Sequence, residues 1–152
     1  MPAIKTRLAM LDDVDDIAPL FDSYRQFYEQ PPDLARARGY LEERMRRNES
    51  VIYVAEDENG KLVGFTQLYP TFCSVRLAHT YVLYDLFVSK AARGAGAGRR
   101  LMEAAEAHAA KAGAARMELS TARTNTVAQS LYESQGWVRD ETFLVYGKSF
   151  AR

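Results

Sequence analysis

The chain has 152 residues, of which 47% are hydrophobic and 26% are charged, and this composition is typical of one globular domain over residues 1–152. Its 20 basic and 20 acidic residues cancel, so no overall field favours nucleic acid or an anionic membrane, and neither partner is expected. No apolar run is long enough to span a bilayer, and the first residues lack the apolar stretch of a signal peptide, which together predict a cytoplasmic protein.

The first half of the chain predicts a strand, two helices and three further strands. Asp12 or Asp13 is the expected N-cap of the first helix, and Pro31 and Pro32 end it. Asp33 is the expected N-cap of the second helix. The expected strands are 3–9, 51–56, 62–69 and about 80–88, with a hairpin turn at 58–61 and with Pro70 ending the third of them.

The second half predicts a helix over 98–112, a short strand over 117–120, a helix over 126–135 and one or two closing strands over 138–150. Gly113 and Gly136 supply the stop signals of the two helices. The resulting order, β-α-α-β-β-β-α-β-α-β, predicts a mixed α/β (α+β) fold in which helices cover both faces of one sheet.

Residues 93–98 read Arg-Gly-Ala-Gly-Ala-Gly and lie between an expected strand and an expected helix. Glycines in this position let several backbone N–H groups converge on a phosphate. A dinucleotide fingerprint would open the first βαβ unit and a P-loop would need Gly-Lys-Ser/Thr, and neither pattern is present. A cradle for the pyrophosphate of coenzyme A fits best, since residues 90–102 carry four basic residues and no acidic one.

Two motifs in this order carry a family resemblance. Arg93, Gly96 and Gly98 match Arg/Gln-x-x-Gly-x-Gly/Ala, and the segment 125–137 matches Asn-x-x-Ala-x-x-Leu-Tyr-x-x-x-Gly. From about residue 81 to 137 the chain thus resembles the GNAT superfamily of acetyl-CoA-dependent N-acetyltransferases. The run 85–88, Asp-Leu-Phe-Val, also looks like the diamine and polyamine branch and its histone-acetylating yeast relatives, although Tyr84 replaces an acidic residue of that branch.

The resemblance implies a GNAT-like, mostly antiparallel sheet of six to seven strands with about four helices. It also implies acetyl-CoA as cosubstrate, bound by the glycine loop, by the backbone of the central strand and by the segment after residue 124. No metal is expected, because one cysteine and two histidines give no zinc-ligand spacing. The residues implied in acetyl-CoA binding are Phe87, Val88, Arg93, Gly94, Ala95, Gly96, Ala97, Gly98, Arg99, Asn125, Ser130 and Tyr132.

Two residues are candidates for catalysis. The resemblance places Tyr132 near the sulfur, where its phenol would protonate the departing thiolate. Asp85 is the ionisable side chain of an otherwise apolar strand, and burial would raise its pKa to that of a useful base for the attacking amine. A structural carboxylate or a proton relay through water is the alternative for Asp85.

The acceptor side is predicted around the segment 24–45. Tyr24, Tyr28 and Tyr84 are the candidate substrate-binding residues, because aromatic faces hold an alkylammonium; packing of the helix on the sheet is the alternative for such a stripe.

The sequence therefore predicts an enzyme that transfers acetyl from acetyl-CoA to a primary amine of a small molecule, or to a lysine or N-terminal amine. The reaction would proceed by direct attack in a ternary complex. A catalytically inactive module that binds CoA or docks a partner is the alternative within the same fold. Two-fold dimers are common among soluble proteins and in the resembled family, so a homodimer is expected.

Overall fold

The computed structural model describes residues 3–151. The chain divides into two compact units, a first that ends at Ser120 and a second that begins at Thr121, and each is described by itself. The first unit contains a sheet of five strands in the order β1-β2-β3-β4-β5. Its strands are β1 (Lys5–Leu8), β2 (Val51–Glu56), β3 (Leu62–Cys73), β4 (Ala78–Val88) and β5 (Arg116–Glu118).

Neighbouring strands are antiparallel except β4 and β5, which are parallel. β2 and β3 form the predicted hairpin, whose turn is held by Asp57: its carboxylate accepts hydrogen bonds from the N–H groups of Asn59 and Lys61. Gly60 supplies the positive φ that this turn needs. The mixed, mostly antiparallel sheet is thus confirmed.

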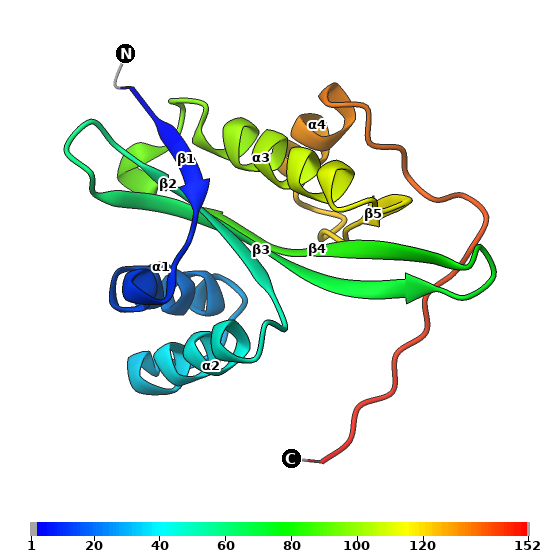
Figure 1. Cartoon of the computed structure of the whole chain (residues 1–152), viewed down its shortest axis with the longest axis horizontal. Helices are drawn as coiled ribbons and strands as arrows, with labels where there is room; N and C mark the ends of the chain where they lie inside the picture. The colour runs from blue at the N-terminus through cyan, green and yellow to red at the C-terminus, as the bar shows by residue number, and fades with distance from the viewer. Residues whose placement is uncertain (1–2, 152) are drawn as a thin grey trace. The chain divides into compact units, whose positions relative to one another are not determined.

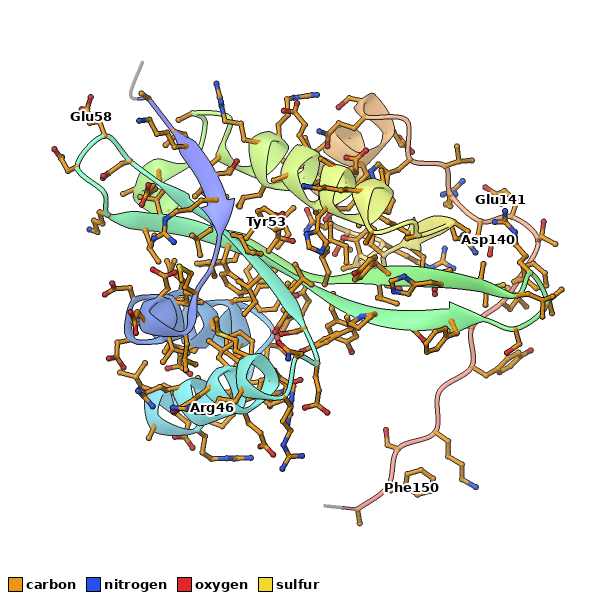
Figure 2. The ribbon with its side chains drawn as sticks, in the orientation of Figure 1. Arg46, Tyr53, Glu58, Asp140, Glu141 and Phe150 are labelled. Atoms are coloured by element: carbon orange, nitrogen blue, oxygen red, sulfur yellow. The ribbon has the colours of Figure 1, made fainter. Side chains whose placement is uncertain are left out.

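Helices cover both faces of the sheet (Figure 1). On one face lie α1 (Val14–Phe27) and α2 (Leu34–Arg46), where Ile17, Phe21 and Leu41 pack with strand residues such as Phe65 in one core cluster. On the other face lies α3 (Ala97–Lys111), whose Leu101 belongs to a second cluster. Tyr53 of β2 points toward α3 (Figure 2), and its hydroxyl lies 3.0 Å from Nδ1 of His108.

The prediction that Pro70 ends the third long strand is wrong. β3 continues to Cys73, and Pro70 lies opposite Tyr81 of β4. The pairing of β2 with β3 extends only to Leu68 opposite Val51, so beyond this point β3 is an edge strand. A proline, which lacks the N–H donor, is tolerated on an edge.

The prediction of closing strands over 138–150 is also wrong for the described residues. The second unit contains α4 (Thr126–Ser134), and residues 137–151 form no helix or strand. Their large apolar side chains are exposed, including Phe143 and Val145. Phe150 is also exposed (Figure 2). Strand propensity alone was misleading here, because a strand forms only when a neighbouring edge takes up its backbone hydrogen bonds. The described sheet therefore has five strands rather than six or seven.

None of the helices within residues 3–151 combines the length and the apolar character that crossing a membrane requires.

Candidate active site

The centre of β4 carries a bulge. Asp85 lies opposite Gln67 of β3 and Leu83 lies opposite Leu68, so Tyr84 is the additional residue of β4. Tyr84 is 64% exposed, and its backbone carbonyl oxygen accepts a hydrogen bond of 3.2 Å from the Tyr24 hydroxyl of α1. A bulge disrupts the hydrogen-bond ladder locally and redirects neighbouring side chains, and bulges are common next to active sites.

Asp85 is a buried carboxylate with few compensating groups. It is 4% exposed, and its Oδ2 accepts a hydrogen bond of 2.8 Å from Nε2 of Gln67. Burial raises the pKa of Asp85 to about 6, although the Gln67 amide and the Tyr24 hydroxyl oppose the rise. At pH 7 such a group is about nine-tenths ionised and still takes up a proton readily, as a general base must.

Asp85 lies on the wall of a cavity of about 640 Å³. The predicted substrate residues Tyr24, Tyr28 and Tyr84 line the same cavity, so the first unit brings the candidate base and the candidate acceptor residues together. Tyr40 and Tyr69 also line it, and their hydroxyl oxygens are 2.7 Å apart.

Gln67 and Tyr69 were not predicted as site residues, and Tyr40 was an aromatic of the acceptor-side segment 24–45 but not one of its candidate substrate-binding residues. Gln67 is fully buried in β3, and a long polar side chain in a mostly apolar strand was the signal that could have revealed it. Burial also raises the pKa values of Tyr24 and Tyr69, since the phenolate form is disfavoured next to Asp85 in a poorly solvated wall. Both tyrosines therefore stay protonated near neutral pH.

The carboxyl-terminal half of β4 has an open edge. β5 pairs with β4 only from Thr80 to Val82, and within residues 3–120 no second strand accompanies residues 83–88. On its other side this part of β4 approaches β3 closely: a Cβ added to Gly64 would lie 2.9 Å from the Phe87 carbonyl oxygen. The open edge includes Phe87 and Val88, the residues predicted to pair with an extended ligand.

The glycine loop joins this strand to α3. Gly94 and Gly96 have φ values of 88° and 84°, and a Cβ at either position would meet nothing within 4 Å. Gly96 is the N-cap of α3 and offers no side chain to the first N–H groups of the helix. An open backbone at a helix N-terminus, where the first N–H groups have no acceptor within the helix itself, suits a phosphate group.

Arg93 is positioned beside the same strand end. Its Nε donates a hydrogen bond of 3.0 Å to the Val88 carbonyl oxygen, and its guanidinium carbon lies 5.7 Å from the centre of the Phe87 ring. Ala97 is buried, whereas Arg99 is exposed in the first turn of α3. Positive charge is thus present at the end of the helix that favours anions.

The second unit holds the other predicted residues. Asn125 is the N-cap of α4, and its Oδ1 accepts a hydrogen bond of 3.2 Å from the N–H of Ala128. Ser130 and Tyr132 lie in α4, and the Tyr132 ring is 6.4 Å from that of Trp137. Their roles toward acetyl-CoA and toward Asp85 stay predictions.

Comparisons with known proteins define the class. The model of the acetyltransferase (GNAT) family matches residues 14–137. An uncharacterized N-acetyltransferase of Bacillus subtilis, YhfO, is 49% identical over 140 residues, which cover 92% of this chain and 93% of the relative. An uncharacterized N-acetyltransferase of Archaeoglobus fulgidus is 30% identical over 142 residues, covering 91% and 96%. The chain belongs to the GNAT family, and it is an acyltransferase.

Solved structures of acetyltransferases have the same fold as this chain. The crystal structure of a "probable acetyltransferase" has a TM-score of 0.92 at 40% identity and covers 97% of this chain and 99% of that one. The ribosomal-protein-alanine N-acetyltransferase of Brucella melitensis biovar Abortus 2308 has a TM-score of 0.80 at 23% identity, covering 96% and 100%, and at this identity the likeness concerns the fold alone.

Within the described residues, no group of three His, Cys, Asp or Glu side chains is placed to hold a metal ion.

Proposed function

We propose that the protein transfers the acetyl group of acetyl-CoA to a primary amine by direct attack in a ternary complex. The observation that carries this proposal is Asp85, a buried carboxylate of raised pKa on the wall of a cavity next to the open edge of β4. The proposal treats the whole chain as one catalytic domain, since the matched family model spans both compact units.

The donor end of the site is the glycine loop and the strand before it. The residues fit a pyrophosphate because Gly94 and Gly96 leave open space where a Cβ would stand, and because the N-cap of α3 has no side chain. N–H groups of residues 94–98 would hold the phosphates, and Arg93 would add charge. When bound, acetyl-CoA supplies an activated acyl group in its thioester.

The open edge of β4 would hold the amide-bearing arm of CoA as an added strand. A backbone N–H near Phe87 or Val88 would also face the thioester oxygen, where negative charge develops. Asn125 and Ser130 would also contact acetyl-CoA. The support for these roles is the unpaired edge and, for Asn125, its position in the family motif.

Asp85 would act as the base. Most amines are protonated at pH 7, and an ammonium has no lone pair with which to attack. The Asp85 carboxylate would accept the proton of the amine, a new C–N bond would form at the thioester carbon, and the C–S bond would break. Tyr132 would give its proton to the leaving thiolate, which departs as the CoA thiol, and the second proton of the acylated nitrogen would restore the Tyr132 hydroxyl, so that a neutral amide remains.

The residues around the cavity do not support the resemblance to the polyamine branch. Among the described lining residues, Asp85 is the single carboxylate, and its neighbour is Tyr84 rather than the acidic residue of that branch. The predicted cytoplasmic location and the predicted homodimer stay predictions.

A calorimetric titration tests the donor site. We expect acetyl-CoA to bind with micromolar affinity and NADH not to bind, and absence of acetyl-CoA binding would overturn the proposal. A panel of amines, assayed for acetyl-CoA-dependent thiol release, tests the transfer itself. Binding without release for any amine would leave a CoA-binding module rather than an enzyme acting on amines.

A further inference from the structure

The cavity next to Asp85 lies wholly within the first unit, and its lining combines a deep acidic group with an aromatic wall and basic groups. The sheet contributes Asp85 and Tyr69, and α1 and α2 contribute rings and guanidinium groups. The full lining is Phe21, Tyr24, Arg25, Tyr28, Gln30, Arg36, Ala37, Tyr40, Tyr69, Val82, Leu83, Tyr84, Asp85 and Ser120.

The two arginines of this lining differ in their surroundings. Nη1 of Arg25 lies 2.8 Å from Oδ1 of Asp22 and 3.3 Å from the Pro31 carbonyl oxygen, and Asp22 is itself buried. Arg25 is therefore one half of a structural ion pair that joins α1 to the loop before α2. Its charge is largely compensated within the protein.

Arg36 is the more exposed of the two arginines. Its side chain is 84% exposed, and its Nε lies 4.0 Å from Oδ2 of Asp33, at the outer limit of an ion pair. Asp33 is also engaged as the N-cap of α2, because its Oδ1 accepts a hydrogen bond of 3.1 Å from the N–H of Arg36. An exposed guanidinium in a weak pair can exchange its partner for a carboxylate or phosphate of a ligand.

The carboxylate of Asp85 and the guanidinium of Arg36 differ in their exposure to solvent. Asp85 on β4 is 4% exposed, whereas the Arg36 side chain on α2 is 84% exposed and forms the solvent-exposed rim of the cavity. Tyr28 and Tyr84 are 46% and 64% exposed, and their rings offer apolar surface to the body of a ligand. The Tyr40 ring is already covered by the guanidinium of Arg44, 4.8 Å from the ring centre, so it serves as a fixed wall.

Resting on the proposed function, we infer that the acceptor is a compound with one primary amine and one negatively charged group. The amine would lie at Asp85 between the tyrosine rings, and the anionic group would lie at Arg36. A polyamine fits poorly, because its second ammonium would find a guanidinium at the rim and no second carboxylate in the described lining.

Three acceptors with one skeleton test this inference: 4-(aminomethyl)benzoate, 4-methylbenzylamine and para-xylylenediamine, which carry a negative, a neutral and a positive second group. The wild-type protein should use them in this order of kcat/KM. Arg36→Glu should lower the ratio of benzoate to diamine by about ten-fold or more, because it reverses one charge at the rim. Arg36→Gln should lower the ratio by a smaller factor.

Arg47→Glu is the matched control. Arg47 is the C-cap of α2, is 65% exposed, pairs with Glu43 and does not line the cavity, so the same change of charge there should leave the ratio unaltered. Folding of the Arg36→Glu variant is expected, since a glutamate three residues after an Asp N-cap suits the first turn of a helix.

Ligand-observed NMR with the same three compounds measures the preference without turnover. Loss of thiol release with all three compounds counts against the proposed function, whereas the order of binding still tests the inference. Stronger binding of the diamine than of the benzoate by the wild-type protein would overturn it. An Arg36→Glu variant with the wild-type ratio would overturn it as well.

Discussion

Replacing Asp85 with asparagine should make the protein more stable and inactive. The pKa of this carboxyl is raised by burial from its ordinary value of 3.8 to about 6, so the folded state binds the proton more tightly than the unfolded chain does. The protonated Asp85 carboxyl therefore contributes to the stability of the fold. This contribution is fully present below pH 4 and is lost as the pH rises through about 6. Above that value the buried charge opposes folding.

The size of the effect follows from the difference of about two pH units, which at about 1.4 kcal/mol for each unit corresponds to about 3 kcal/mol at pH 7. Asparagine has almost the same shape, and its oxygen can still accept the hydrogen bond from Gln67. Its amide can also donate to Oε1 of Gln67, which is buried and has no hydrogen-bond partner. We expect Asp85→Asn to raise the free energy of unfolding at pH 7 by up to about 3 kcal/mol.

Urea unfolding of both proteins between pH 4 and 8 measures this difference, and thiol release measures the activity. The gain in stability should be greatest at pH 7 to 8 and should fade toward pH 4. Activity should fall by about a hundred-fold to ten-thousand-fold, as expected for loss of a general base. A variant that is less stable than wild type at pH 7 would refute the inference that burial raises the pKa of Asp85. A variant that retains activity would refute its role as the general base.

Three further variants test the rest of the site. Tyr132→Phe should lower turnover by about ten-fold to a thousand-fold with little change in acetyl-CoA affinity, and unchanged turnover would remove Tyr132 from the mechanism. Gly96→Val should weaken acetyl-CoA binding measured by calorimetry. Gly60→Val is its control and should affect stability alone, because Gly60 has a similar positive φ in a distant turn. Equal affinities of the two variants for acetyl-CoA would mean that the glycine loop is only a turn. Gly64→Ala should lower the free energy of unfolding by about 1–3 kcal/mol, because its Cβ would lie 2.9 Å from the Phe87 carbonyl oxygen, whereas Gly39→Ala on α2 meets nothing and should be neutral or stabilising. Urea unfolding distinguishes these two variants, and equal stabilities would argue against close approach of β3 and β4.

Most secondary structure was predictable because its signals are local. Asp33 caps α2 and Asn125 caps α4 within three residues of their partners, and Gly60 sits in a turn that needs a positive φ. Pro70 was misleading for the opposite reason. Whether a proline ends a strand depends on whether a neighbour needs its N–H, and that is decided by where β2 stops.

The sequence by itself determined the helices, the hairpin, the glycine loop and the candidacy of Asp85, since each follows from spacing along the chain. Only the tertiary structure decided that β4 is bulged at Tyr84 and that one edge of its carboxyl-terminal half is left unpaired by β5. It also decided that Arg36 and Asp85 line the same cavity. These features depend on register and on the packing of helices against the sheet. Residues far apart in the chain meet only through such packing, and it places a carboxylate in an apolar wall where its pKa rises.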